Sequence, residues 1–223
     1  MKKGDFVELE YTGRIKDMDL VFDTTSEKEA KENKIHDAKA SYGPIIICIG
    51  QGHVIKGLDE ELEGKEPGKK YHIELSPEQG FGKKNAKLIQ LVATSKFVKQ
   101  KINPMPGLQV NIDGMMGMIR TVSGGRTLVD FNHPLAGKEL VYDFKINRII
   151  KDDEEKLKAL LKLQLNLKDI KADIKEGNAT VSLNIKQELP KPIEEKLTKN
   201  IKELIPSIKK IKFKAMQTKA KEK

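Results

Sequence analysis

The side chains that most often carry chemistry in enzymes are few and scattered in this chain. The four histidines, at positions 36, 53, 72 and 133, form neither an H-E-x-x-H motif nor a close pair, so a loop or core role is favoured over a metal site. Cys48 lies inside an apolar run, which indicates a small buried side chain and not a nucleophile. No nucleophile elbow supports serine catalysis. The sequence predicts no metal site.

The glycines around position 50 do not form a nucleotide-binding loop. After Gly50 and Gly52 the next glycine is Gly57, two places beyond the G-x-G-x-x-G spacing. Gly57 is followed by Leu58-Asp59, which also breaks the pattern of a Walker loop. We therefore expect no cofactor.

What remains is a set of aromatic and aliphatic residues at strand ends and near loop glycines, with one acid among them. Tyr11 ends an alternating stretch, Phe22 and Asp23 end a short apolar stretch, and Val54 follows the glycine turn. Periodicity alone leaves Tyr11, Phe22 and Val54 as compatible with an ordinary core as with a binding pocket.

The order and spacing of several segments resemble the FKBP family of peptidyl-prolyl cis-trans isomerases. Residues 132–138, Asn-His-Pro-Leu-Ala-Gly-Lys, resemble the signature of its SlyD-type branch, which carries a chaperone domain inserted in the flap near the active site. The resemblance covers residues 1–150, and the additional C-terminal region makes the chain look like the long archaeal FKBP type. The other matching segments are Val7–Gly13, Val21–Asp23, Gly50–Leu58 and Ser76–Gly82.

By position, the resemblance implies a pocket that grips a proline ring. Its polar edge would be Tyr11 and Asp23, which orient the substrate carbonyl, and the backbone N–H of Ile55 would hold a carbonyl. The implied catalytic residues are Tyr11, Phe22, Asp23, Phe81 and Tyr142, and the implied substrate-binding residues are Ile45, Val54, Ile55 and Leu58.

Three departures from the family pattern change what is expected. Leu58 stands where eukaryotic members usually have a tryptophan, so we expect a wider and less selective pocket. Phe81 replaces a tyrosine and removes a hydroxyl that can bind ligand, which argues against tight macrolide binding. The C-terminal tail is rich in lysine and not in histidine or cysteine, so the nickel binding of some bacterial relatives is not carried over.

Hydrophobic periodicity predicts the elements that hold these residues. Residues 27–43 are polar and are expected to form a surface excursion. We expect an α+β fold, with an FKBP-type antiparallel sheet around a short helix as the resemblance implies. The predicted strands cover residues 5–11 (ended by Thr12-Gly13), 45–49, 70–75 and 140–150, and the predicted helix covers residues 54–63.

A small β-rich domain is expected within the first one. Residues 85–131 alternate short β-like pieces with turn signals such as Asp113-Gly114. The thioether of methionine adapts to irregular apolar partners, so this domain is predicted to bind unfolded chains, with core filling as the alternative for each methionine. The expected chaperone face is Phe97, Met105, Met115, Met116 and Met118.

The C-terminal region is expected to be a separate α+β domain. A helix, a hairpin around Gly177-Asn178, a second helix and a strand are predicted after residue 150. Residues 151–223 hold 19 of the 42 Lys and Arg but 12 of the 33 Asp and Glu. The sequence thus predicts three domains: residues 1–84 with 132–150 (isomerase), 85–131 (insert in the flap) and 151–223.

The predicted function is a peptidyl-prolyl isomerase that accelerates proline-limited folding and binds unfolded chains through the insert. The alternative is a non-catalytic holdase chaperone or a dimeric interaction module with the same fold. The basic end at 205–223 favours a homodimer or client-binding module over contact with nucleic acid or the ribosome, because no aromatic residues are interleaved with its lysines. One cysteine and no apolar run of about 20 residues predict a cytoplasmic protein without a membrane span.

Overall fold

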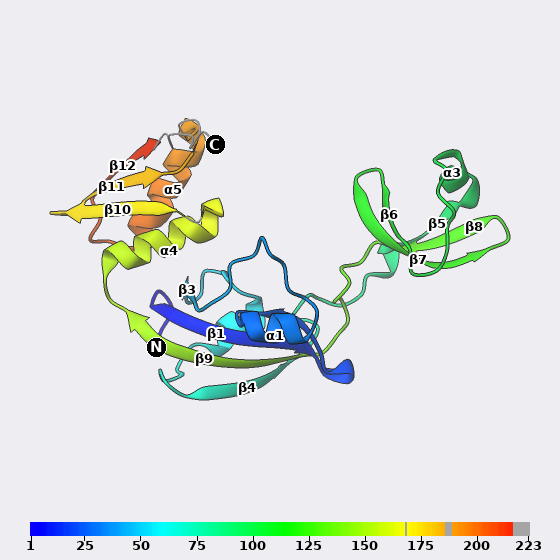
Figure 1. Cartoon of the computed structure of the whole chain (residues 1–223), viewed down its shortest axis with the longest axis horizontal. Coiled ribbons are helices and arrows are strands. Elements are labelled where there is room, and N and C mark those ends of the chain that lie inside the picture. Colours follow the sequence, from blue (N-terminus) through cyan, green and yellow to red (C-terminus); the bar gives the residue numbers. More distant parts are fainter. Residues whose placement is uncertain (168, 186–188, 216–223) are drawn as a thin grey trace, which may run out of the picture. The chain divides into compact units, whose positions relative to one another are not determined.

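The computed structural model describes residues 1–167, 169–185 and 189–215 (Figure 1). The chain forms two compact units. The first unit comprises Met1–Glu74 together with Val141–Lys223, and the second unit comprises Leu75–Leu140. Helices and mostly antiparallel sheets are combined, which confirms the predicted α+β class. No helix in these described ranges is long and apolar enough to cross a membrane.

The sheet of the first unit is organised around β1, which pairs with three other strands. Antiparallel β3 pairs with its first half, from Phe6 to Leu9, and antiparallel β2 with its second half, from Thr12 to Ile15. β1 therefore continues past Thr12-Gly13, where the sequence predicted its end, because β2 supplies backbone partners there. The sheet order is β2-β1-β9-β4, and the strands are β1 (Phe6–Ile15), β2 (Leu20–Thr24), β3 (Ile45–Cys48), β4 (Lys70–Leu75) and β9 (Leu140–Ile150).

Two short helices accompany this sheet, and a 3-10 turn (Lys16–Met18) joins β1 to β2. Helix α1 (Glu27–Glu32) lies in the predicted polar excursion, and Ser26 caps it by accepting a hydrogen bond from the Glu29 N–H at 3.3 Å. Helix α2 covers Lys56–Glu61 only. It is shorter than predicted, so Val54 and Ile55 lie in the loop before it.

The second unit contains the predicted β-rich insert (green in Figure 1). Its sheet order is β5-β8-β7-β6, and its small core contains Phe97, Val110, Ile119 and Val129. Phe97 is 3% exposed, so its prediction as part of a chaperone face was wrong: α3 turns this ring inward. The elements are a 3-10 turn (Ala86–Leu88), β5 (Ile89–Ala93), α3 (Thr94–Lys99), β6 (Gln109–Ile112), β7 (Met115–Ser123) and β8 (Arg126–Asp130).

The C-terminal region follows the predicted order of helix, hairpin, helix and strand. Asp152 caps its first helix by accepting a hydrogen bond from the Glu155 N–H at 2.9 Å. The hairpin turns at Glu176-Gly177, both with positive φ, and the last strand runs parallel to β11. The elements are α4 (Asp153–Leu165), β10 (Ile170–Lys175), β11 (Asn178–Leu183), α5 (Lys191–Leu204) and β12 (Lys210–Ala215).

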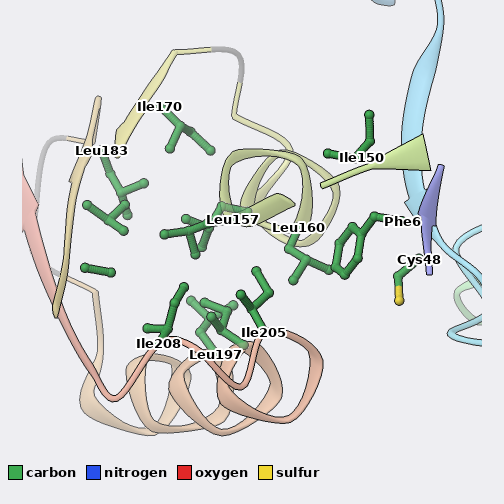
Figure 2. Close-up of a cluster of buried hydrophobic side chains, with 14 residues drawn as sticks. Phe6, Cys48, Ile150, Leu157, Leu160, Ile170, Leu183, Leu197, Ile205 and Ile208 are labelled. Carbon is green, nitrogen blue, oxygen red and sulfur yellow. The ribbon is translucent and has the colours of Figure 1, made fainter. Parts of the chain in front are cut away.

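One hydrophobic core joins the C-terminal elements to the first sheet (Figure 2). Phe6 and Cys48 contribute side chains from β1 and β3, and Leu157 and Leu160 contribute from α4. Burial raises the pKa of the Cys48 thiol to about 12, which agrees with the predicted role as a small buried side chain. Hydrogen bonds also link these elements: Arg148 of β9 donates to Glu8 of β1 at 2.8 Å and to Glu155 of α4 at 3.0 Å.

We expect Leu160→Ala to lower the free energy of unfolding by about 3 kcal/mol, because the side chain is fully buried and its loss leaves a cavity. Leu163→Ala on the same helix is the control, since Leu163 is 39% exposed and should cost far less. Urea unfolding followed by circular dichroism measures both. Equal losses in the two variants would contradict the role of this core.

Candidate active site

An aromatic cluster lies on the inner face of the first sheet. The Tyr142 ring of β9 is 1% exposed and forms the floor of this cluster. Its centroid lies 5.7 Å from the Tyr11 ring of β1 and 5.9 Å from the Phe22 ring of β2, with the Phe22 contact edge to face. Tyr11 and Phe22 are half-buried, so the cluster presents apolar surface outward.

Gly13 makes this close packing of the rings possible. A Cβ at this position would lie 2.9 Å from ring atoms of both Phe22 and Tyr142. Any larger residue would push one of these rings away. From the sequence, Gly13 was expected to help end a strand, although a glycine inside a strand is itself a signal of close approach.

The polar edge of the cluster is a hydrogen bond between Tyr11 and Asp23. The Tyr11 hydroxyl donates to Asp23 Oδ2 at 2.9 Å, and Asp23 is exposed. Burial first, and then the Asp23 carboxylate, raises the pKa of Tyr11 well above its usual value. The same two causes raise the pKa of Tyr142. Both phenols therefore remain neutral hydrogen-bond donors at physiological pH.

The loop that carries Val54 and Ile55 is held by side chains on both sides of it. Asp59, buried in α2, accepts hydrogen bonds from the N–H groups of Gly50 and Gly52, each at 2.9 Å. His53 Nδ1 accepts from the Cys48 N–H at 3.0 Å, and burial lowers the pKa of this imidazole, which keeps it neutral. Sequence reasoning missed the role of Asp59, because only the folded loop brings it to these amides.

The remaining predicted site residues lie in different places. Leu58 is fully buried in α2, and Ile45 is half-buried at the start of β3. Phe81 belongs to the second unit, where its ring stacks on His133 with the centroids 4.4 Å apart. Of the insert methionines, Met105, Met115 and Met116 are exposed and Met118 is half-buried.

A hollow of about 800 Å3 lies on the first unit and shares Tyr11 with the cluster. Its lining residues include several charged side chains, and two of these pair with each other, His72 Nδ1 with Asp143 Oδ1 at 2.8 Å. In the described residues, no group of three or more His, Cys, Asp or Glu could hold a metal ion. Tyr11 thus belongs both to the aromatic cluster and to the lining of this hollow.

We expect Asp59→Asn to loosen the loop, because one amide oxygen cannot replace two carboxylate oxygens as acceptor. Amide hydrogen exchange at Gly50 and Gly52 should accelerate, and the free energy of unfolding should fall by about 1–2 kcal/mol. Glu60→Gln, at the exposed neighbouring position, is the control and should change neither. Unchanged exchange in Asp59→Asn would show that the loop is held by something else.

Known families and proteins match most of the chain. A family described as FKBP-type peptidyl-prolyl cis-trans isomerase matches residues 1–98, and one described as the IF domain of FKBP26 matches residues 90–135. The short-type peptidyl-prolyl cis-trans isomerase of Methanocaldococcus jannaschii is 35% identical over 150 residues, which are 67% of this chain and 94% of that protein.

Two bacterial proteins are also similar. The FKBP-type 16 kDa peptidyl-prolyl cis-trans isomerase of Escherichia coli is 31% identical over 110 residues, which cover 48% of this chain and 74% of that protein. The SlyD isomerase of Vibrio cholerae is 30% identical over 121 residues, covering 52% and 59% respectively. These matches confirm the predicted resemblance, and the chain belongs to the FKBP family of peptidyl-prolyl cis-trans isomerases.

Proposed function

We propose that the aromatic cluster is the site at which this FKBP-type isomerase catalyses the cis-trans isomerisation of Xaa-Pro bonds in polypeptides. The observation that carries the proposal is the packing of Tyr11, Phe22 and Tyr142 around Gly13, with Asp23 at the open edge. This arrangement offers aromatic surface to a proline ring and one polar side toward which a carbonyl can turn.

The physical demand of the reaction suits such a site. Rotation about the Xaa-Pro bond breaks amide resonance, with a barrier of about 18–20 kcal/mol, and breaks no covalent bond. The twisted amide is less dipolar than the planar one, so an apolar pocket that removes water favours the transition state over the ground state. Such a reaction requires no nucleophile, metal or cofactor.

Each part of the site has a role in this proposal. Phe22 and Tyr142 grip the proline ring, and Val54 is a further apolar contact that the family resemblance implies. The neutral Tyr11 hydroxyl and Asp23 orient the carbonyl. The backbone N–H of Ile55 holds a second carbonyl, and among the described residues no hydrogen bond occupies this N–H. Ile45 and Leu58 of the same unit are the further pocket residues that the family resemblance implies, whereas Phe81 belongs to the second unit.

We expect Phe22→Ala to lower kcat/KM for a short Xaa-Pro peptide by about tenfold or more, since about 1.4 kcal/mol of transition-state binding corresponds to a factor of ten. Leu20→Ala is the control: Leu20 is 47% exposed on the same strand and lies outside the cluster. Protease-coupled isomerisation measures the rates, with folding checked by circular dichroism.

An unchanged rate in a folded Phe22→Ala variant would remove the cluster as the active site. No acceleration by the parent protein would favour the alternative, a holdase chaperone that keeps the fold without turnover. Measuring the parent protein beside the variant separates these two outcomes: the first concerns only the position of the active site, and the second concerns the isomerase activity itself.

We further propose that the insert binds unfolded chains, as the chaperone role of SlyD-type relatives supports. Met105, Met115 and Met116 are 52%, 47% and 59% exposed, and the neighbouring domain surface adds Leu91 and Val98, both 63% exposed. Flexible thioethers adapt to varied apolar partners. Binding a chain here raises the local concentration of its prolines at the isomerase site.

We expect Met115→Gln with Met116→Gln to slow the proline-limited refolding of a protein substrate several-fold more than the turnover of a short peptide. The control is Leu163→Gln with Ile193→Gln, which removes two exposed apolar residues outside the insert. Equal losses for both substrates, or equal losses in the control, would contradict the role of the insert.

Three expectations remain predictions. They are the division into three domains at residues 84/85, 131/132 and 150/151, a homodimer or nucleic-acid contact through the C-terminal region, and a cytoplasmic location. The residues that would make the basic contact include Lys210, Lys212 and Lys214 of β12. Lys219, Lys221 and Lys223 lie outside the described residues.

A further inference from the structure

A cavity of about 280 Å3 lies at the base of the insert, wholly within the second compact unit. On one side it is lined by Met116 and Met118, which share a face of β7 because they alternate with Gly117. Pro134 adds a further apolar wall. The remaining lining is mainly basic or amide-bearing: Lys84, Gln109, Arg120, Asp130, Asn132, His133 and Lys138.

The one acid of this cavity is already fully engaged. Asp130 is 4% exposed, and its Oδ2 accepts from Arg120 Nε at 3.1 Å and Nη2 at 2.7 Å. Its Oδ1 accepts from the backbone and side-chain amides of Asn132, at 2.9 and 2.8 Å. Burial would raise the pKa of this carboxyl, but the hydrogen bonds from Arg120 and Asn132 lower it to about 2. Asp130 therefore stays charged and balances Arg120.

Two lysines remain in excess over this balanced pair. Lys84 Nζ lies 3.9 Å from Asp130 Oδ2. This ion pair is long, and the same oxygen already accepts hydrogen bonds from Arg120. Lys138 makes no ion pair with any of the described residues. The cavity thus combines an apolar wall of thioethers with two cations: Lys138, which has no ion pair among the described residues, and Lys84, which shares Asp130 with Arg120.

We propose that this cavity is a subsite of the polypeptide substrate that takes a carboxylate next to an apolar side chain. The carboxylate binds Lys84 and Lys138, and the apolar neighbour packs on Met116 and Met118. The volume suits one or two side chains and is below that of a typical small-molecule pocket, about 300–1,000 Å3. The inference rests on the proposed binding of unfolded chains by the insert, and it gives that binding a chemical preference.

The carboxylate has two sources, the side chain of Asp or Glu and the free end of a chain. Three labelled peptides separate them: one with an internal Glu beside Leu and an amidated end, the same peptide with Gln, and the Gln peptide with a free carboxylate end. Fluorescence anisotropy with the full-length protein measures their dissociation constants at low and high salt.

We expect the Glu peptide to bind about two- to fivefold more tightly than the amidated Gln peptide at low salt, the range of a partly exposed ion pair. The preference should weaken as salt screens it. Tighter binding of the Gln peptide with a free end would assign the chain terminus as a second source of the carboxylate.

The variants test whether these lysines cause the preference. Lys84→Gln with Lys138→Gln should bring the Glu-to-Gln ratio to about one, and Lys138→Glu should invert it. The controls are Lys87→Gln and Lys99→Gln, two exposed lysines of the same domain that do not line the cavity and should keep the parental ratio. Lys138→Gln alone, which should lower the ratio, serves if the double variant does not fold.

A parental ratio of one, with both peptides bound, would overturn the subsite and leave the chain-binding role intact. A ratio that persists in the lysine variants would also overturn it. Failure of the protein to bind any peptide or to assist refolding would overturn both the subsite and the proposed role of the insert.

Discussion

The pairing register of β1 decides which of its side chains reach the aromatic cluster and which reach the C-terminal core. Tyr11 and Gly13 lie on the face of β1 that contacts Tyr142. Phe6 points to the opposite face of the strand and packs against α4. A shift of one residue would exchange these faces and disrupt both structures. β3 and β2 fix the register from two successive stretches of the same edge, so the site and the C-terminal region depend on one set of backbone pairings.

The proposed isomerase site would gain from rigidity, because it would act by shape and desolvation. Ring packing over Gly13 fixes the floor, and the carboxylate of Asp59 fixes the loop that presents Ile55. Groups held in place before substrate arrives lose little entropy on binding, which leaves more of the binding free energy for the twisted amide. The neutral phenol of Tyr11 adds a donor without the cost of burying a charge.

The resemblance of several motifs predicted the family and its fold, and periodicity predicted most strands, but neither could reveal contacts between residues distant in sequence. β1 was expected to end at Thr12-Gly13, because a glycine usually interrupts a strand. In the structure Gly13 lies inside the strand, where the rings of Phe22 in β2 and Tyr142 in β9 leave no room for a side chain. Helix α1 buries only Ala30, so it shows no apolar stripe, although Ser26 and Glu29 have capping spacing. Phe97 resembled an exposed anchor until α3 placed it in the small core of the insert.

In its proposed role, the insert would have to hold a chain firmly enough to retain it and weakly enough to release it after isomerisation. Met116 belongs both to the exposed apolar surface and to the wall of the basic cavity. A chain that packs on Met116 therefore brings its neighbouring residues within reach of Lys84 and Lys138. Each such contact contributes little alone, since exposed ion pairs are worth about 0–1 kcal/mol. Several weak contacts in series give retention through avidity, while any one of them breaks readily, so prolines can be presented in turn.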